Sequence, residues 1–462
     1  MSRIFLLSTN VTVDPYPVYP LGMAVLAGAL TAKGHQVFQY DFLAGGCDEA
    51  LLRRAIEEFH PDLVGLSLRN IDNVDSFSGG NGWYLAQARD QVKLVRKATG
   101  APLVVGGPAF SIMPEAILDY LGADYGIVGE GERALCALID RLMSGETIPP
   151  LFVDSGPALK REEMAAPLYR QDLVEFYVGR SGMINLQTKR GCPFVCAYCT
   201  YPFLEGNRFR PRDPAAVVED LRGIRRDHGN PTVFFTDSIF NDSEGHYLVL
   251  AEEIIRSQIN VRWCAFFRPA GMGRPELALL KRSGLYALEL GTDAASDATL
   301  SELGKGFAFS EVLRFNEDCL AERLPCAHFI IFGGPGETAA TLAVGLKNIA
   351  ALGPSVVFAF SGIRILPGSP LCERARREGV ITAGQSLLEP FYYHSPSIDI
   401  DSMNELIRHS FQGFRQRIFP PSDGQVRMEV MRRFGFSGIL WDRLVSFAGK
   451  GGRGREQCAV IP

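Results

Sequence analysis

The sequence predicts an α/β protein made of two successive parallel-sheet domains. We expect a doubly wound, Rossmann-like domain, then a partial (β/α)6 barrel, then a small α-rich C-terminal segment. Apolar runs of strand length alternate with helical patterns through most of the chain, which is typical of βαβ units. At 462 residues the chain is longer than one hydrophobic core usually organises, so more than one domain is expected.

The composition is that of a soluble globular protein, with 47% hydrophobic and 21% charged residues. A formal net charge of −5 offers no basic surface, so no nucleic-acid partner is expected. No apolar run reaches the ~18 residues of a transmembrane segment, and the N-terminus lacks the pattern of a signal peptide. Seven of the ten cysteines are scattered singly, as in proteins of the reducing cytosol, which favours a cytoplasmic location.

Residues 1–148 are expected to form the first domain. Its alternation predicts a parallel sheet covered by helices on both faces. The expected strands are Ile4–Ser8, Val37–Phe42, Leu63–Leu68, Leu103–Val105 and Tyr125–Val128, and the expected helices are Leu21–Lys33, Glu49–Phe59, Tyr84–Thr99 and Pro114–Leu121. Ligands of such sheets bind at the carboxyl ends of the strands, where this chain has glycine-rich loops.

Prolines and polar residues predict a linker over residues 149–180. Residues 181–385 resume the alternation in six longer units, which predicts an open barrel with its active groups at the carboxyl ends of the strands. The expected barrel strands are Met183–Gln187, Thr232–Thr236, Arg262–Phe267, Ala287–Leu290, Phe329–Phe332 and Val356–Phe360. Residues 386–462 are expected to form a C-terminal cap and tail, with helices at Met403–Ile418, Glu429–Phe434 and Ile439–Phe447.

Three cysteines lie within eight residues just after the first barrel strand, as Cys192, Cys196 and Cys199 in a C-x3-C-x2-C pattern. Such spacing is unsuited to a disulfide framework but suits three thiolates on one soft metal centre. In a 4Fe–4S cluster, three cysteines leave one iron open for a further ligand. A structural zinc loop with a distant fourth ligand is the alternative, although the chain has no second C-x2-C pair.

This loop, with an aromatic residue before its third cysteine, resembles the signature of the radical S-adenosylmethionine (SAM) enzymes. The resemblance implies a 4Fe–4S cluster on the three cysteines, SAM chelated by the open iron, and an external electron donor such as flavodoxin or ferredoxin. It places Tyr198 against the adenine of SAM. It also implies SAM contacts at later strand ends, from Thr236, Asp237, Glu289, Asp293, Gly334, Glu337 and Arg364. Many relatives have Glu-Ser where this chain has Asp293-Ala294.

The first domain resembles the cobalamin-binding domain that precedes the barrel in one large branch of radical SAM enzymes. The resemblance implies cobalamin contacts from the strand-end loops, namely Arg69, Asn70, Gly106, Gly107, Pro108, Gly129, Glu130 and Gly131. The D-x-H-x-x-G motif, whose histidine ligates cobalt in many cobalamin proteins, is absent. Either cobalamin is bound without a protein ligand to cobalt, or the domain has lost it. The loop around Arg69 resembles that of the tryptophan 2-C-methyltransferase group, in which an arginine lies beneath the cobalt.

Together these resemblances imply a cobalamin-dependent radical SAM enzyme, a C-methyltransferase that moves a methyl group from SAM through methylcobalamin to an unactivated or aromatic carbon. The acceptor is a small molecule or a lipid, and the transfer is either radical or polar. One alternative is a radical SAM enzyme that forms or rearranges rings or lipid chains without methyl transfer, with cobalamin spectating or absent. Another is a non-catalytic iron–sulfur or zinc sensor. The sequence singles out no catalytic residue.

Overall fold

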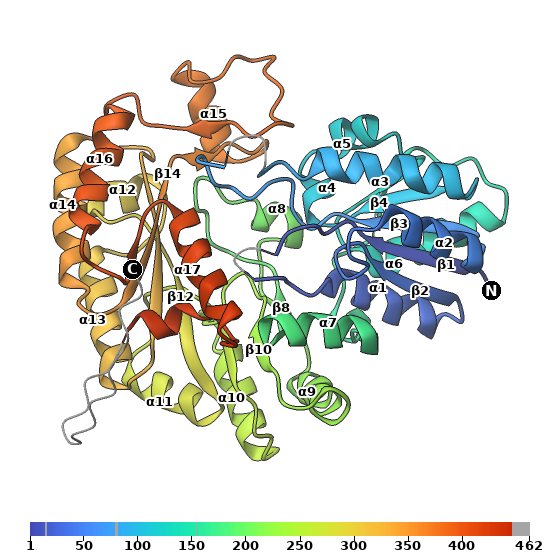
Figure 1. Ribbon diagram of the computed structural model, residues 1–462, viewed down its shortest axis with the longest axis horizontal. Coiled ribbons are helices and arrows are strands. Elements are labelled where there is room, and N and C mark those ends of the chain that lie inside the picture. The colour runs from blue at the N-terminus through green and yellow to red at the C-terminus, as the bar shows by residue number, and fades with distance from the viewer. Residues whose placement is uncertain (14–15, 79–81, 155, 446–462) are drawn as a thin grey trace.

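The computed structural model describes residues 1–13, 16–78, 82–154 and 156–445. They form two lobes side by side, each built on a parallel sheet (Figure 1). This arrangement confirms the predicted α/β class and the order of the two sheets. Among the described residues, no helix is both long enough and apolar enough to cross a membrane.

The first sheet has six parallel strands in the order β2-β1-β3-β4-β5-β6. Its strands are β1 (Arg3–Ser8), β2 (Gln36–Asp41), β3 (Leu63–Ser67), β4 (Leu103–Gly106), β5 (Tyr125–Val128) and β6 (Leu151–Val153). Its helices are α1 (Leu21–Ala32), α2 (Glu49–Phe59), α3 (Leu85–Ala98), α4 (Pro108–Ile112), α5 (Pro114–Leu121) and α6 (Gly131–Met143). The strand order reverses between β1 and β3, as in doubly wound folds.

Alternate residues of β1 serve the two faces of this sheet. Phe5 and Leu7 pack with residues of α2, α3 and α5, whereas Ile4 and Leu6 pack with residues of α1 and α6. Successive side chains of a strand point to opposite faces, so an almost continuous apolar run is what a strand covered on both sides requires.

The stretch that we expected to be a linker contains regular structure. β6 adds a sixth strand to the first sheet, a 3-10 turn spans Arg161–Glu163, and α7 spans Gln171–Ser181. Leu173, Val174 and Tyr177 of α7 are buried among residues of both lobes. The helix therefore belongs to the packed interior and is no loose connection.

The second sheet has seven parallel strands in the order β17-β14-β13-β12-β11-β10-β7. They are β7 (Met183–Leu186), β10 (Thr232–Phe235), β11 (Trp263–Phe267), β12 (Leu285–Asp293), β13 (Cys326–Phe332), β14 (Val356–Ser361) and β17 (Arg417–Ile418). The outer helices are α9 (Pro214–His228), α10 (His246–Arg256), α11 (Arg274–Arg282), α13 (Phe309–Ala321), α14 (Ala339–Ala351) and α16 (Ile400–Phe411). No pairing of β7 with β17 is found among the described residues, so the barrel is open, as predicted.

The C-terminal segment corrects one expectation. The predicted helix Met403–Ile418 ends early, because α16 stops at Phe411 and Gly413 has a φ of +84°. A left-handed residue breaks a helix, and glycine adopts it without strain. The chain then enters β17, which pairs with β14 and gives the barrel its seventh strand. The segment is thus part of the sheet as well as a cover.

The rest of the C-terminal segment packs into the barrel. α17 (Pro421–Arg433) contacts β14, and a 3-10 turn (Trp441–Leu444) contacts β13 and β14 (Figure 1). The Gly438 N–H donates to the Ser181 carbonyl at 2.7 Å, next to β7. Trp441 is buried among inward-facing side chains of the strands. The predicted helix Ile439–Phe447 is only this short turn over its described part, and the predicted tail lies outside the described residues.

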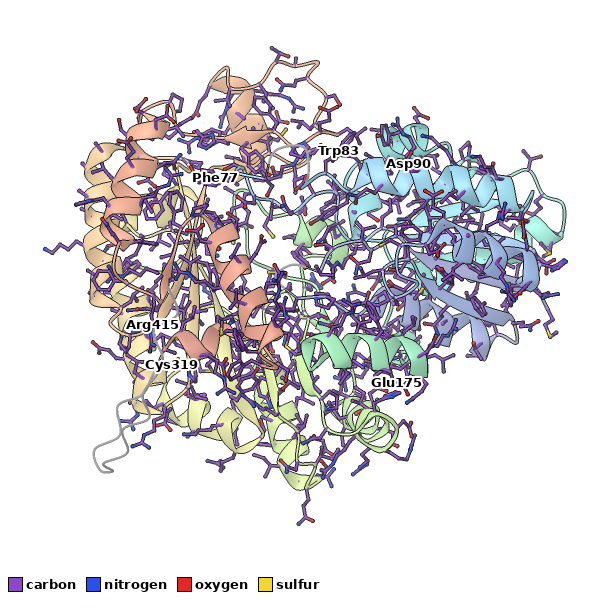
Figure 2. The ribbon with its side chains drawn as sticks, in the orientation of Figure 1. Phe77, Trp83, Asp90, Glu175, Cys319 and Arg415 are labelled. Carbon is purple, nitrogen blue, oxygen red and sulfur yellow. The ribbon has the colours of Figure 1, made fainter. Side chains whose placement is uncertain are left out.

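The loop after β3 ties the first lobe to the barrel. Asp72 forms a buried ion pair with Arg364 of β15 (Ile363–Arg364), with Oδ2 and Nε 2.7 Å apart. The Trp83 indole N–H donates to the Leu388 carbonyl at 3.0 Å, and the Phe77 ring lies edge-on to that of Phe419 at 5.4 Å. Phe77 and Trp83 are labelled in Figure 2, where Phe77 lies over the barrel lobe.

The Asp72–Arg364 pair leads to a prediction about stability. Replacing Asp72 by asparagine leaves a buried guanidinium without its counter-charge, which costs about 3–5 kcal/mol in comparable buried pairs. We expect the midpoint of urea unfolding of Asp72→Asn, followed by circular dichroism, to fall well below that of the wild type. The control Arg54→Gln removes one partner of the exposed Arg54–Glu58 pair and should leave the midpoint unchanged. An unchanged midpoint in Asp72→Asn would show that the pair does not stabilise the fold.

Candidate functional site

The loops with the predicted site residues meet between the two lobes. The cysteine loop follows β7 and the short strand β8 (Lys189–Arg190), and leads into α8 (Tyr201–Glu205). α8 lies between the two lobes in Figure 1 and packs against α4, which starts at Pro108 in the first lobe. The carboxyl ends of strands from both sheets therefore border one region, as ligand sites of parallel sheets do.

The three cysteines sit together on the barrel side of this region. Cys192 is buried, and Cys196 and Cys199 are partly exposed. Burial raises the pKa of Cys199 to about 12, with further contributions from Cys196 and Cys192, so all three thiols lie close to one another. Within the described part of the chain, no group of three or more His, Cys, Asp or Glu forms a single-ion site. The donor set fits a 4Fe–4S cluster, because each cysteine then binds a different iron.

A glycine allows the cysteine loop to begin where it does. Gly191 has a φ of +84°, and a Cβ there would lie 1.9 Å from the carbonyl oxygen of Arg208. Its N–H donates to the Glu205 carboxylate at 3.1 Å, and the Cys192 N–H donates to the Gly206 carbonyl at 3.0 Å. The backbone of α8 and its flanks therefore holds the first cysteine in place.

Asp237 lies directly beneath the cysteine loop. It is fully buried and accepts hydrogen bonds from the Thr188 N–H at 2.7 Å, the Thr188 hydroxyl and the Lys189 N–H at 3.2 Å. The Lys189 ammonium is 3.1 Å from Asp237 and 3.4 Å from Asp242. The Asp237 carboxylate thus fixes the segment that carries the cysteines, and its expected contact with SAM stays a prediction.

Asp293 and Tyr198 meet beside the cysteines. The Tyr198 hydroxyl donates to Asp293 Oδ2 at 2.5 Å, and the Lys305 ammonium pairs with the same oxygen. Asp293 has a φ of +61°, which is uncommon for a residue with a side chain and holds the carboxylate in this position. Cys196 acts on the pKa values of both Tyr198 and Lys305, so this cluster borders the cysteine loop.

Lys305 was not among the predicted site residues. It is buried, and burial opposes its charge, but the nearby Asp293 and Cys196 raise its pKa on balance. Arg268 lies next to it and donates to the Lys305 and Gly306 carbonyls at 2.8 and 2.7 Å, with its guanidinium over the Phe194 ring. Two cations thus flank the cysteine loop, where the three thiolates and four sulfides of a 4Fe–4S cluster would need counter-charge. A lone lysine in a loop gives no sequence signal for this role.

The remaining expected SAM contacts fall into different places. The Thr236 hydroxyl donates to the Leu186 carbonyl, and Glu337 accepts from the Thr341 hydroxyl at 2.6 Å and the Gly333 N–H at 3.3 Å. Arg364 is held by Asp72 and by the carbonyls of Ile365 and Leu387, all at 2.7 Å. Gly334 lies in the turn between β13 and α14. Glu289 lies inside the barrel against Trp441. Their roles toward SAM stay predictions.

Arg69 occupies the first-lobe side of the region. Burial lowers its pKa, and Tyr177, Tyr84, Tyr16 and Asp41 oppose that effect. No hydrogen bond or ion pair joins it to another described residue, so its guanidinium is available to a bound group. Asn70, next to it, is exposed.

The two histidines of the first lobe lie away from Arg69. His35 directly precedes β2, and His60 lies three residues before the start of β3. Both are therefore at the amino ends of their strands, opposite the loops that carry the predicted cobalamin contacts. The residues of these loops therefore fit a cobalamin that has no histidine on its cobalt.

The glycine loop after β4 is shaped for close approach of the backbone. Gly107 has a φ of +105°, and a Cβ there would lie 2.4 Å from the Leu68 carbonyl oxygen. Pro108 begins α4 directly afterwards, while Gly106 ends β4. The Gly129 N–H donates to the Ser111 hydroxyl at 2.9 Å, which joins this loop to the one after β5. These loops are packed against each other, as a flat ligand surface requires.

Glu130 makes contacts that the sequence did not suggest. Its carboxylate is 2.7 Å from Arg190 and 2.9 Å from Arg210, and it accepts the Leu159 N–H at 3.0 Å. Glu132, one residue beyond Gly131, lies 2.6 Å from the other terminal nitrogen of Arg190. Arg210 and Arg190 lower the pKa of Glu130 against the effect of burial. The loop after β5, where cobalamin contacts are expected, is thus joined by ion pairs to β8, the strand that leads into the cysteines.

Tyr201 and Tyr16 each lie near Arg69 and near one other part of the site. Burial raises the pKa of Tyr201, which Glu205 and Cys199 raise further and Arg69 opposes. Burial also raises the pKa of Tyr16, with Glu289 adding to the rise and Arg69 opposing it. Arg69 is therefore near the cysteine loop through Tyr201 and near the barrel interior through Tyr16.

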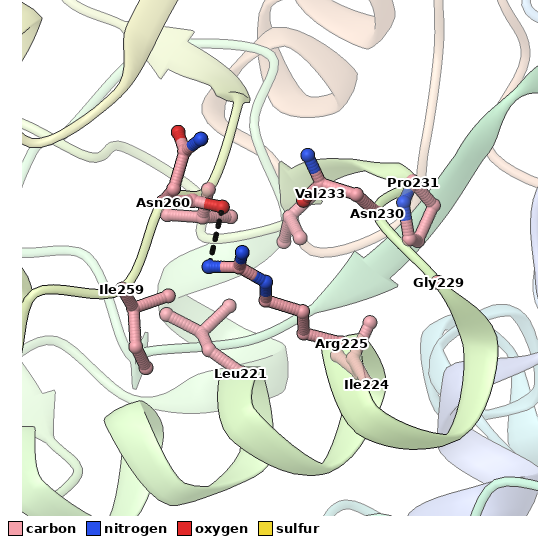
Figure 3. Close-up of a pocket in the computed structure, with 10 residues that line it drawn as sticks. Leu221, Ile224, Arg225, Gly229, Asn230, Pro231, Val233, Ile259 and Asn260 are labelled. Atoms are coloured by element: carbon pink, nitrogen blue, oxygen red, sulfur yellow. Dashed lines mark hydrogen bonds between the residues drawn. The ribbon is translucent and has the colours of Figure 1, made fainter.

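A pocket at the other end of the barrel is separate from this region. Arg225 crosses it and donates to the Asn260 carbonyl at 3.3 Å (Figure 3). Its walls include Pro231 and Val261, which precede β10 and β11 at their amino ends. It therefore lies opposite the cysteine loop and takes no part in the site.

Comparison with known proteins identifies both halves of the chain. The model of the B12 binding domain matches residues 7–139, and that of the radical SAM superfamily matches residues 186–344. The chain is 26% identical over 428 residues to the tryptophan 2-C-methyltransferase of Streptomyces laurentii, covering 76% of this chain and 71% of that protein. It is 24% identical over 323 residues to the hopanoid C-3 methylase of Methylococcus capsulatus, covering 64% and 58%.

A solved structure has the same fold. The radical SAM methyltransferase TsrM from Kitasatospora setae, solved with cobalamin and a [4Fe-4S] cluster bound, superposes with a TM-score of 0.84 at 24% identity. The likeness covers 96% of this chain and 97% of that one. These matches confirm the predicted family, the order of the two domains and the fold class.

The cysteine loop gives a second prediction. In Cys196→Ala one iron of the cluster loses its protein ligand, so we expect the variant, reconstituted with iron and sulfide without oxygen, to lose most of its bound iron and visible absorbance. Cys136→Ala is the matched control, because Cys136 is a buried thiol of α6 and should leave the iron content unchanged. Full iron content in Cys196→Ala would contradict the ligand assignment.

Proposed function

The chain is a cobalamin-binding radical SAM enzyme, and we propose that it is a C-methyltransferase acting on a small molecule. The methyl group would come from SAM and reach the acceptor carbon through cobalamin. The observation that carries the proposal is that Arg69 of the first lobe and Cys199 of the cysteine loop both act on the pKa of Tyr201, in α8, which packs against α4 of the first lobe. This supports one region between the lobes as the place of both cofactors. The tryptophan 2-C-methyltransferase and hopanoid C-3 methylase among its relatives support C-methylation.

The protein's own contribution is to position and to exclude water. When bound, cobalamin carries the methyl group, and the cluster and SAM supply the methyl source and the electron chemistry. Cys192, Cys196 and Cys199 would hold the cluster. Arg69 would face the bound cobalamin, and its guanidinium, a cation without a lone pair, would not ligate the metal.

The side chains of Tyr198, Asp293 and Lys305 would lie on the SAM side of the site. The Asp293 carboxylate already holds the Tyr198 hydroxyl and the Lys305 ammonium, which fixes the tyrosine ring beside the cysteines. A ring fixed in this way offers a face for the adenine. Lys305 pairs with this carboxylate, so two donors hold Asp293 beside the cysteine loop.

We also propose an external low-potential electron donor and a cytoplasmic location. The nine cysteines among the described residues are all free thiols, which supports a reducing compartment. A small-molecule acceptor is preferred to a lipid because the relative with the higher identity is named for tryptophan.

Methylcobalamin formation tests the proposal. The protein, reconstituted without oxygen with cluster and hydroxocobalamin, is given a reductant and SAM with an isotopically labelled methyl group. We expect labelled methylcobalamin bound at about one equivalent per chain, detected by absorbance and mass spectrometry. Cys136→Ala should behave as the wild type.

Other outcomes would point to different functions. Release of 5′-deoxyadenosine without bound cobalamin would favour the ring-forming or rearranging alternative. A protein that binds neither SAM nor cobalamin would overturn both readings.

A further inference from the structure

Aromatic rings line the interior of the barrel. Phe234 and Phe266, of β10 and β11, pack ring against ring at a centroid distance of 5.0 Å. Phe329 of β13 packs in the same way with Phe358 and Phe360 of β14, at 5.2 and 6.4 Å, and β12 lies between these two groups of rings. Tyr16, from a loop of the first lobe, lies 6.5 Å from Phe234. Phe266 is 40% exposed although it lies within a central strand. The interior beside it is therefore not filled by protein.

One carboxylate faces this aromatic interior. Glu289 is paired in register with Phe266, and side chains of such neighbours in a parallel sheet point to the same face. Glu289 is only 4% exposed, and its Oε1 accepts the Trp441 indole N–H at 3.1 Å. No described residue donates to its other oxygen. A buried carboxylate with half of its hydrogen-bonding capacity unused is costly unless a ligand completes it.

Glu289 lies too deep to belong to the cysteine loop. Its partner on the neighbouring strand β13 is Ala327 and that of Asp293 is Ile330, three residues further, which at about 3.3 Å per residue places Glu289 roughly 10 Å below the Tyr198–Asp293–Lys305 cluster. Trp441 closes the barrel beneath it. Glu289, although it was itself one of the expected SAM contacts, therefore lies at the floor of the interior, while Tyr198 and Asp293 lie at its rim.

The groups that face Glu289 do not compete for a cation or a proton. Tyr16 and Cys264 are the titratable groups coupled to it, and burial raises the pKa of each well above its ordinary value, so both stay neutral near pH 7. Burial also raises the pKa of Glu289 to about 7, against the hydrogen bond from Trp441. Among these groups, Glu289 alone changes charge in the neutral range.

We propose that Glu289 binds the protonated amino group of an aromatic methyl acceptor whose ring lies among the phenylalanines. This inference rests on the proposed methyltransferase function and names its substrate class. Aromatic faces attract both flat rings and cations, and a carboxylate in their midst selects a positive charge and rejects an anion. Trp441 holds the carboxylate in place by one oxygen and leaves the other to the amine.

Calorimetric titration with three indoles tests the substrate class. The cluster- and cobalamin-loaded protein is titrated with tryptamine, with the uncharged 3-methylindole and with the anionic indole-3-propionate. We expect tryptamine to bind at least about tenfold more tightly than either of the others, because only it forms a charge-assisted hydrogen bond. Equal binding of tryptamine and 3-methylindole, or tighter binding of indole-3-propionate, would overturn the proposal.

The variant Glu289→Gln separates the charge from the shape of the site. The amide oxygen still accepts from Trp441, so the fold is retained, but the affinity for tryptamine should fall about 10- to 100-fold while that for 3-methylindole is unchanged. Asp442→Asn is the matched control. It removes a carboxylate next to Trp441 that lies 3.8 Å from Arg262, and it should leave both affinities unchanged.

The pH dependence of the affinity for tryptamine tests the role of Glu289 on the wild-type protein, without a variant. The tryptamine ammonium, like that of lysine, stays charged up to about pH 10, whereas a carboxyl with a pKa near 7 gains its charge between about pH 6 and pH 8. The affinity for tryptamine should therefore rise about tenfold over this range and then level off. A flat profile would contradict the role of Glu289.

The outcomes distinguish the two proposals. If labelled methylcobalamin forms but the indoles show no charge preference, the substrate class is wrong and the methyltransferase function stands. If the charge preference is found but no methylcobalamin forms, the amine site stands and the proposed function is wrong.

Discussion

The ion-pair network of Glu130, Glu132, Arg190 and Arg210 is the interaction on which the site depends. It joins a loop of the first lobe to the two short strands that frame the cysteine loop, with separations from 2.6 to 3.0 Å. All four side chains are largely removed from water. Charges in such a position are costly unless each finds its partner, so the network specifies one arrangement of the lobes more than it adds stability. In that arrangement Arg69 and the cysteines border the same region.

The charged groups near the site divide into two kinds. Asp237 and Arg364 are saturated by protein groups, so they fix backbone, one beneath the cysteine loop and one across the lobes. The partly exposed Arg69 makes no hydrogen bond or ion pair with a described residue, and the buried Glu289 is held through one oxygen only. A folded chain keeps such groups only at some cost, and groups that bear this cost are commonly those that meet a ligand. Whether protein groups satisfy a charged side chain, and not how deeply it is buried, therefore separates the residues that position backbone from those proposed to bind a ligand.

Much of the fold could be predicted because buried parallel strands are near-continuous apolar runs, as at Ile4–Ser8 or Val356–Phe360. β6 and β17 escaped prediction because three- and two-residue strands carry no periodicity. The cysteine loop could be recognised as a candidate metal site because its spacing pattern is local in sequence. The partners of Glu130 were not, since Arg190 and Arg210 lie 60 and 80 residues away. Trp441 reaches Glu289 across 152 residues, a contact that only the folded barrel creates.

The central claim is that cobalamin would lie over Arg69, without a donor from the protein, and opposite the cysteine loop. Electron paramagnetic resonance of the protein loaded with cluster and cob(II)alamin tests both parts in one sample. The account predicts a cobalt signal without nitrogen hyperfine splitting, broadened by spin–spin coupling when the cluster is reduced. A nitrogen-split signal would place a ligand where Arg69 should lie. A cobalt signal that is unaffected by reduction of the cluster would show that the two cofactors do not share one site.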